Sequence, residues 1–282
     1  MRGLNVVSTF DGIACCYEAL RRAGIPVRNY YASEVDTDAM RVASSNHPDI
    51  HQMDDITKWR DWDIDFGDVQ LVTGGFCCQS FSVGGKRRGF EDPCGQLFYP
   101  MVELYEHIES LNPNVIFLFE NVHKIKKADL AIINERIGVE PQMINSALVS
   151  AQNRKRLYWT NIPYTLPEDR GILLTHVIPG ATAAGFHGKL DKATGKYPQH
   201  LAVDPTGHGK ANCITTTPST TCKYMKDGKL YNITALEAEI LQTLTEGYTN
   251  LPGLCKTKRL KMIGNGWTPE LISCIFSGIN IS

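Results

Sequence analysis

The chain has 282 residues, of which 43% are hydrophobic, and a formal net charge of −1. This length suits one α/β domain with a small appendage, and no stretch approaches the roughly 20 apolar residues of a membrane span. The charge gives no bulk signal for nucleic acid, although basic clusters occur, as at 86–88 and 256–261. Because the N-terminus runs straight into a strand-like segment without a signal peptide, we expect a protein of the cytoplasm, nucleoid or nucleus.

Strand-like and helix-like segments alternate through the first half of the chain. We expect strands at 4–8, 27–33, 69–73 and 115–119, and helices at 15–23, about 36–45 and 97–110. This alternation predicts an α/β fold with a doubly wound, mostly parallel sheet, as in Rossmann-like folds. In such sheets ligands bind beyond the carboxyl ends of the strands.

The composition of the sequence changes at about 164–229, which is rich in Gly, Thr, Pro, His and Lys and has weak periodicity. We predict a small irregular region there. A helical pattern returns at 233–244, where Thr234 and Glu237 fit a capping box, and a last helix is expected at 270–279. The chain is therefore divided into 1–163, 164–232 and 233–282.

The number and spacing of the nine cysteines argue against a disulfide framework and against a metal site. Their number is odd, and the pairs Cys15-Cys16 and Cys77-Cys78 are adjacent, unlike the cysteines of zinc sites. We expect reduced thiols, most of them small core residues, and no metal.

Polar residues that follow the expected strands at 4–8 and 27–33 and a third strand position before Asp55 are typical of a nucleoside site. The turn at 10–13, Phe-Asp-Gly-Ile, leads into a helix whose first amides favour a polar or anionic group. Glu34 ends the second strand, where an acid can bind both hydroxyls of a ribose. Asp55 can accept a hydrogen bond from an adenine amino group, with Ile56 against the ring. Together these features predict an adenosyl ligand.

A candidate nucleophile and its partners follow the later strands. Cys78 lies in a glycine-rich loop at a strand end, and a reactive thiol there needs positive charge or helix-end amides nearby. Glu120 ends a central apolar strand, where a carboxylate is costly unless it has a partner, and a proton-donating role is expected. Arg154 and Arg156, two residues apart at a strand start, should point the same way and polarise a carbonyl oxygen or hold phosphate. A buried inert thiol and a structural carboxylate are the alternatives.

In order and spacing these segments resemble the cytosine-C5 DNA methyltransferase family. The turn at 10–13 resembles its cofactor motif, Cys78-Gln79 its catalytic loop, 120–122 its Glu-Asn-Val motif and 152–156 its Gln-x-Arg-x-Arg motif. The segment 264–269 resembles the closing motif, which folds back to the cofactor, and 233–282 is expected to return to the catalytic domain of 1–163. The likeness leaves out about 164–229, where the family places its target recognition domain. It is strongest to the catalytic domains of animal de novo enzymes and phage relatives, so a phage or bacterial source is compatible with it.

The resemblance implies methyl transfer from S-adenosylmethionine to C5 of cytosine in double-stranded DNA. Cys78 would attack C6, Glu120 would bond N3 and the amino group, and Arg156 with Arg154 would bind O2. The base must leave the duplex, and the loop 79–95 is the candidate for closing over it. The implied cofactor contacts are Phe10, Asp11, Gly12, Ile13, Glu34, Val35, Asp55, Ile56, Gly74, Leu97, Asn265, Gly266 and Trp267. The candidate DNA contacts are Gln79, Ser82, Lys86, Arg87, Arg88, Lys210, Thr215 and Thr216.

Three departures from the family pattern stand out. Cys77 occupies the usual proline slot before the nucleophile, Tyr231 replaces an arginine and Cys15 replaces a glycine. Since proline would stiffen the loop, Cys77 is expected to loosen it or to offer a second thiol.

Three other functions stay open: the same chemistry on RNA, a non-catalytic DNA-binding regulatory homologue, and transfer of a modified methyl group. The small middle region predicts either a short recognition sequence or a homodimer that extends the DNA footprint.

Overall fold

The computed structural model describes residues 3–82, 88–187, 200–204, 207–216 and 222–280. The chain forms two compact units, each assembled from separate stretches of sequence. The first unit comprises Met1–Ile144, Lys155–Leu166 and Ile272–Ser282, and the second comprises Asn145–Arg154 and Pro167–Leu271.

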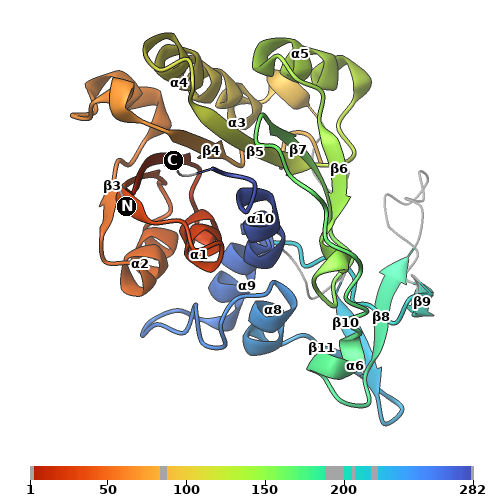
Figure 1. The fold of residues 1–282 in the computed structure, drawn as a ribbon. Coiled ribbons are helices and arrows are strands. Elements are labelled where there is room, and N and C mark those ends of the chain that lie inside the picture. The colour runs from red at the N-terminus through yellow and green to blue at the C-terminus, as the bar shows by residue number, and fades with distance from the viewer. Residues whose placement is uncertain (1–2, 83–87, 188–199, 205–206, 217–221, 281–282) are drawn as a thin grey trace. The chain divides into compact units, whose positions relative to one another are not determined.

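The first unit is built on a seven-stranded sheet with the strand order β3-β2-β1-β4-β5-β7-β6 (Figure 1). Neighbours from β3 to β5 run parallel, and β7 runs antiparallel to β5. The predicted mostly parallel α/β sheet is therefore confirmed. The strands are β1 (Leu4–Thr9), β2 (Val27–Ser33), β3 (Ile50–Gln52), β4 (Leu71–Gly74), β5 (Ile116–Val122), β6 (Gln142–Asn145) and β7 (Lys155–Thr160).

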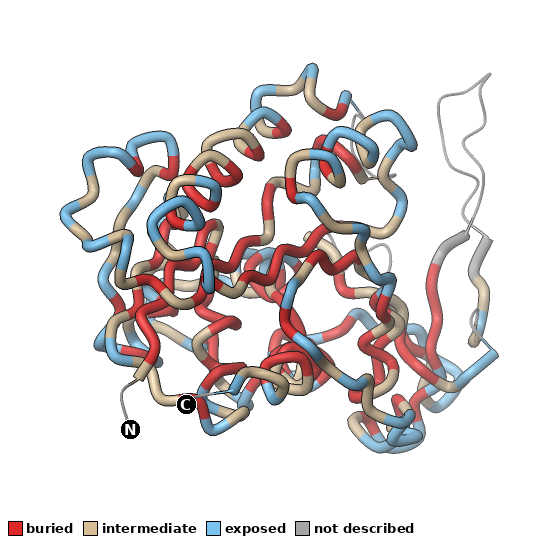
Figure 2. The backbone as a smooth tube through the Cα atoms, turned by 45° about the horizontal axis from the view of Figure 1, so that its top comes forward, coloured by how far each residue is buried: buried red, intermediate tan, exposed pale blue. Residues whose placement is uncertain are grey.

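Helices cover both faces of this sheet, with α1 and α2 on one face and α4 and α5 on the other (Figure 1). All of β1 and β4 is therefore buried (Figure 2), as expected for strands covered on both faces. Val7 packs in the same apolar core as Met101 of α4 and Phe119 of β5, while Val6 points to the opposite face. The helices are α1 (Cys15–Arg22), α2 (Thr37–Asn46), α3 (Pro93–Gln96), α4 (Phe98–Leu111) and α5 (Lys127–Ile137), with 3-10 helices at Ile56–Asp61, Phe66–Asp68 and Gly89–Glu91.

The strand register brings the ends of β1, β2 and β4 to one edge of the sheet. Thr9 at the end of β1 pairs with Ser33 of β2 and with Gly74 of β4, and Gly74 pairs with Phe119 of β5. The strands pack closely here, because a side chain at Gly74 would overlap Thr9 Oγ1. The loops that leave β1, β2 and β4 thus start side by side, at the edge where α/β sheets bind ligands.

The second unit contains a four-stranded sheet that the sequence did not predict. Its order is β11-β10-β8-β9, with antiparallel neighbours. The prediction of an irregular region is thus corrected, since short strands among glycines and threonines show little periodicity. The elements are α6 (Leu174–Val177), β8 (Thr182–His187), β9 (His200–Val203), β10 (Lys223–Lys226) and β11 (Lys229–Asn232), with a 3-10 helix at Ser146–Leu148.

Three helices follow: α8 (Ala235–Leu241), α9 (Lys256–Asn265) and α10 (Pro269–Phe276). The predicted capping box starts α8, because the Glu237 amide donates to Thr234 Oγ1 at 3.2 Å and the Thr234 amide donates to Glu237 Oε2 at 2.7 Å. In the part of the chain that the structure describes, we find no helix of the length and apolarity that crossing a membrane requires.

Candidate active site

The turn after β1 holds an unusual backbone conformation. Phe10, Gly12 and Ala14 have φ angles of 54°, 62° and 61°. Glycine adopts this region at little cost, whereas Phe10 and Ala14 are strained there and must be held by their surroundings. One such restraint is the Asp11 amide, which donates to Ser33 O of β2 at 3.1 Å. Strain of this kind concentrates at functional sites, which agrees with the predicted cofactor role of the turn.

Asp11 is buried in this turn with one carboxylate oxygen unsatisfied. Its Oδ1 accepts hydrogen bonds from Ser8 Oγ and from Tyr30 OH, each at 2.6 Å. Its Oδ2 is also buried, and none of the described residues donates a hydrogen bond to it. Burial raises the pKa of Asp11 to about 6, although the two hydroxyl donors oppose the shift. A buried acceptor without a donor is costly, so Oδ2 fits a hydrogen-bond donor of a ligand.

Glu34, at the end of β2, is oriented by three backbone amides. Its Oε2 accepts from the Gly12 amide at 2.9 Å, and its Oε1 accepts from the amides of Val35 and Asp36 at 2.8 Å. The carboxylate therefore joins the β1 turn to the start of α2. Val35 beside it is 68% exposed, which leaves an apolar side chain open to a ligand ring.

The predicted adenine contacts lie beyond β3. Asp55 caps the 3-10 helix Ile56–Asp61 by accepting from the Thr57 amide at 2.9 Å, and this hydrogen bond lowers the pKa of Asp55. Ile56 is buried in the apolar core, and Leu97 packs against the same core. Only 4% of the surface of Ile56 is exposed, which leaves little of it for an adenine ring.

Cys78 lies in the loop after β4, and its peptide group is held by a tight turn. Its carbonyl oxygen accepts from the amides of Phe81 at 3.1 Å and Ser82 at 2.8 Å. The thiol is half-buried. The start of the loop is fixed to β5, because Asn121 Nδ2 donates to Phe76 O at 3.0 Å. Sequence reasoning assigned Asn121 no separate role, although its place in the Glu-Asn-Val motif marked it.

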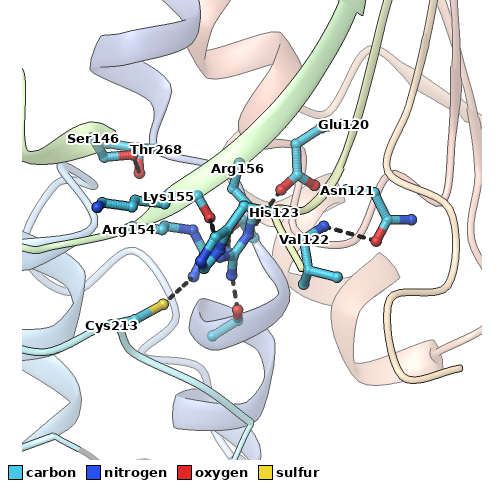
Figure 3. A network of polar contacts seen from close by, with 12 residues as sticks. Glu120, Asn121, Val122, His123, Ser146, Arg154, Lys155, Arg156, Cys213 and Thr268 are labelled. Carbon is cyan, nitrogen blue, oxygen red and sulfur yellow. Dashed lines mark hydrogen bonds and ion pairs between the residues drawn. The ribbon is translucent and has the colours of Figure 1, made fainter. Parts of the chain in front are cut away.

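Glu120 and Arg156 form an ion pair across two strands (Figure 3). The register pairs Glu120 of β5 with Tyr158 of β7 and Val122 with Arg156, so residues 120 and 156 are diagonal neighbours on one face. Arg156 Nε lies 2.9 Å from Glu120 Oε1, and their side chains are only 12% and 9% exposed. The guanidinium group also donates to Lys155 O at 2.9 Å.

The prediction that Arg154 reaches a carbonyl oxygen of a base or a phosphate is corrected, because its guanidinium group is bound within the second unit. Since β7 begins at Lys155, the alternation of a strand does not extend to Arg154. Arg154 is 2% exposed, and its guanidinium group donates to the carbonyl oxygens of Ile214 at 3.0 Å, Gly264 at 3.1 Å and Gly266 at 2.8 Å. It also donates to Cys213 Sγ at 3.5 Å (Figure 3). Its bonds go to two segments of the second unit, at 213–214 and at 264–266, in place of a base or phosphate.

The predicted closing motif lies at the end of α9 in the second unit. Gly266 O accepts a further hydrogen bond from Gln242 Nε2 at 2.5 Å. A side chain at Gly264 would overlap the carbonyl group of Thr215, so the motif packs directly on the segment predicted to contact DNA. Asn265 is exposed, whereas Trp267 is buried.

The structure places the candidate DNA contacts in different environments. Lys210 is 5% exposed, and its Nζ donates to Ala147 O at 2.5 Å, Ser150 O at 3.2 Å and Asp169 Oδ1 at 3.2 Å. The prediction that it contacts DNA is corrected, because its ammonium group is held inside the unit. Gln79 and Arg88 are exposed, Ser82, Thr215 and Thr216 are half-buried, and Lys86 and Arg87 lie outside the described residues.

The expectation of reduced thiols is corrected at one pair of cysteines. Cys77 and Cys94 form a disulfide, with Cα atoms 5.8 Å apart and a sequence separation of 17. The separation matches no recognised spacing pattern, so only the fold, which returns α3 to the β4 loop, reveals the pair. Cys78 keeps its thiol.

Comparison with known proteins gives one family. Residues 4–169 match the family described as C-5 cytosine-specific DNA methylase. The orphan methyltransferase M.SPRI of Bacillus phage SPR is 33% identical over 179 residues, which are 56% of this chain and 37% of that protein. The type II methyltransferase M.NlaIV of Neisseria lactamica is 30% identical over 183 residues, or 58% and 42% of the two chains. The chain thus spans less than half the length of these relatives.

Solved structures share the fold at low sequence identity. The Entamoeba histolytica methyltransferase EhMeth has a TM-score of 0.70 and 13% identity, covering 99% of this chain and 98% of the other. A Spodoptera frugiperda DNMT2 mutant has a TM-score of 0.67 and 15% identity, covering 97% of this chain and 100% of the other.

Proposed function

Because the chain belongs to the family of C-5 cytosine-specific DNA methylases, we propose that it transfers a methyl group from S-adenosylmethionine to C5 of cytosine in double-stranded DNA. The observation that carries this proposal is the buried pair of Glu120 and Arg156. It lies on β5 and β7, and β5 is paired in register with β4, whose following loop bears Cys78. A nucleophile and two groups that recognise a base are thus supplied by three adjacent strands.

The chemistry follows from what these side chains can do to a cytosine. Attack of the Cys78 thiolate on C6 forms a carbon–sulfur bond and moves an electron pair towards C5, N3 and O2. Glu120, protonated or sharing a proton with N3, stabilises the developing charge by hydrogen bonds to N3 and the exocyclic amino group, and Arg156 does so at O2. Once C5 carries the methyl group that the cofactor would supply, solvent takes the C5 proton; the electron pair of that bond restores the ring double bond and expels the Cys78 sulfur. The base must be flipped out of the duplex for the thiolate to reach it.

The residues at the strand ends fit the cofactor, which supplies an electrophilic methyl group when it is bound. Asp11 Oδ2 lacks a donor within the described chain, and the cofactor's ammonium group is such a donor. Glu34 is already oriented by three amides and can accept from ribose hydroxyls. Val35 offers an exposed apolar surface for the adenine ring, and Asp55 can accept from the adenine amino group.

We assign the DNA contacts to the catalytic loop and to the second unit, because exposed polar side chains are found there. Gln79 and Arg88 are exposed near the two described ends of the loop, and residues 164–232 are proposed as the target recognition region. Their small size favours a short recognition sequence or a homodimer. Closure of the loop 79–95 stays a prediction, because 83–87 lie outside the described residues.

The test is methyl transfer from labelled S-adenosylmethionine to cytosine-containing duplex DNA, with transfer RNA as a parallel substrate. We expect label in DNA at C5, mapped by bisulfite sequencing. The Cys78→Ser variant should lose transfer, and the Cys255→Ser variant, which changes an exposed thiol, should keep it. Label in RNA alone would overturn the choice of substrate. Cofactor binding without transfer to either nucleic acid would favour a regulatory protein.

A further inference from the structure

The disulfide beside the nucleophile is not part of the chemistry proposed above. Cys77 immediately precedes Cys78, and Cys94 lies in the first turn of α3. We propose that Cys77–Cys94 is a thiol–disulfide exchange site for low-molecular-weight thiols, and that the closed bond holds Cys78 in its attacking position. The proposal deepens the proposed function, because it concerns the control of the same loop.

Both ends of the bond suit reversible exchange. Cys77 and Cys94 are half-buried, so neither residue is enclosed in the apolar core. Partly exposed disulfides exchange more readily than fully buried structural ones. Cys94 is itself well anchored, because Asp92 caps α3 and accepts from the Cys94 amide at 3.0 Å. The bond therefore joins the peptide before the nucleophile to a fixed helix start.

Other contacts keep the two cysteines close when the bond opens. The Gly89 amide donates to Ser80 O at 3.0 Å, and a side chain at Gly95 would overlap the Gly89 carbonyl group. The rings of Phe81 and Phe90 meet edge to face with centroids 5.3 Å apart. Since these contacts do not depend on the disulfide, the opened pair stays within reach and can close again.

The state of the bond changes the freedom of the backbone before Cys78. The family resemblance places proline in this slot, where its ring would fix one dihedral angle. A reduced Cys77 has no such restriction. The disulfide restricts the same residue from its side chain, so the oxidised chain regains the stiffness that the missing proline would give.

A low-molecular-weight thiol is the only co-reactant that reduction of the Cys77–Cys94 disulfide requires. The thiolate of the reductant attacks one cystine sulfur, breaks the sulfur–sulfur bond and forms a mixed disulfide. A second thiol releases this adduct. Cys77 and Cys94 together gain two electrons and two protons, and the reductant leaves as its own disulfide. Closing reverses these steps with an oxidised thiol.

The full chain should be equilibrated in buffers of defined reduced-to-oxidised glutathione ratio. Peptide mass spectrometry then measures the Cys77–Cys94 linkage, hydrogen exchange measures the amides of 78–82, and single-turnover assays measure methyl transfer. We expect the amides of 78–82 to exchange hydrogen more slowly in the disulfide-linked chain. The linked chain should also transfer methyl about three- to tenfold faster, because small displacements of a reacting group are costly. Intact mass identifies chains with glutathione on Cys78, which are excluded from the rates.

Two variants make the result decisive. Cys94→Ser should show one rate in all buffers, equal to that of the reduced parent, whereas Cys255→Ser should respond as the parent does. Absence of the disulfide-linked peptide at every glutathione ratio would overturn the proposal. A linked chain whose hydrogen exchange and methyl-transfer rate equal those of the reduced chain would overturn it as well. Linkage and slowed exchange without DNA methylation in any buffer would support the exchange site and overturn the proposed function.

Discussion

The edge of the seven-stranded sheet and the interior of the second unit both contain charged residues that the sequence marks as functional. At the sheet edge, Asp11 keeps a buried oxygen without a donor among the described residues, and Glu34 is oriented by amides at the end of its strand. In the second unit, Arg154 and Lys210 donate to carbonyl oxygens of their own unit. A charged group whose bonding capacity is filled by its own chain supports the fold, and one with capacity left can serve a ligand.

Glu120→Gln should give the largest effect at the sheet edge. The change keeps the shape of the side chain but removes the charge that pairs with Arg156. We expect single-turnover methyl transfer to fall by about 10²- to 10³-fold, with cofactor affinity by calorimetry unchanged. Near-normal transfer would make the pair structural and erase the contrast between the two regions.

Arg154→Met should damage stability instead. It removes a buried charged donor from the carbonyl oxygens of Ile214, Gly264 and Gly266, although Gly266 O keeps its bond from Gln242 Nε2. Hydrogen bonds to a charged group are worth about 1.5–3 kcal/mol each, so the free energy of unfolding in urea should fall by roughly 3 kcal/mol or more. Arg136→Met is the matched control, since its pair with Glu106 is largely exposed and is worth less than about 1 kcal/mol. Equal losses from the two variants would contradict this assignment.

Asp11 predicts a pH dependence of stability. Burial raises its pKa from 3.8 to about 6, so between these values the folded chain holds a proton that the unfolded chain has released. The free energy of unfolding should therefore fall as pH rises from about 4 to 6, by up to about 3 kcal/mol from this group. Asp11→Asn keeps an oxygen acceptor and removes the titration. Urea unfolding at several pH values measures the slope, and parallel slopes in both proteins would refute the prediction.

The smallest effect concerns the salt dependence of DNA binding. Arg88→Ala removes an exposed cation, and we expect the slope of log affinity against log salt to decrease by about one. Lys210→Met should leave that slope unchanged, because the ammonium group is internal. Fluorescence anisotropy with a labelled duplex measures both, after circular dichroism has shown that each variant is folded. A reduced slope for Lys210→Met would return that residue to the DNA surface.

Sequence predicted the residues whose position follows from strand ends alone. In a parallel sheet the carboxyl ends share an edge, so strand order alone brings the turn at 10–13, Glu34 and Cys78 to the same place. Glu120 was placed by the same logic, as the charged residue that interrupts an apolar strand. These inferences need only the hydrophobic periodicity of each segment, its length and the order of the segments along the chain.

Sequence could not predict which partner each charged group takes. Arg154 and Arg156 are two residues apart, yet only Arg156 lies within β7, which begins at Lys155. Arg154 therefore binds backbone carbonyl groups, whereas Arg156 pairs with Glu120. Lys210 looks like a surface cation until the carbonyl oxygens of Ala147 and Ser150 are seen around it. The Cys77–Cys94 bond likewise depends on a chain return that no spacing encodes.

The division of the chain sets an order of assembly during synthesis. β7 belongs to the first unit but follows Asn145–Arg154 of the second, and Ile272–Ser282 follows the whole of Pro167–Leu271. A ribosome that adds roughly 5–20 residues per second therefore releases β5 before its antiparallel neighbour exists. The first unit becomes complete only after the second has emerged. For the same reason, grafting the second unit alone onto a relative requires cuts around both of its segments, because a single cassette that spans it would also carry β7.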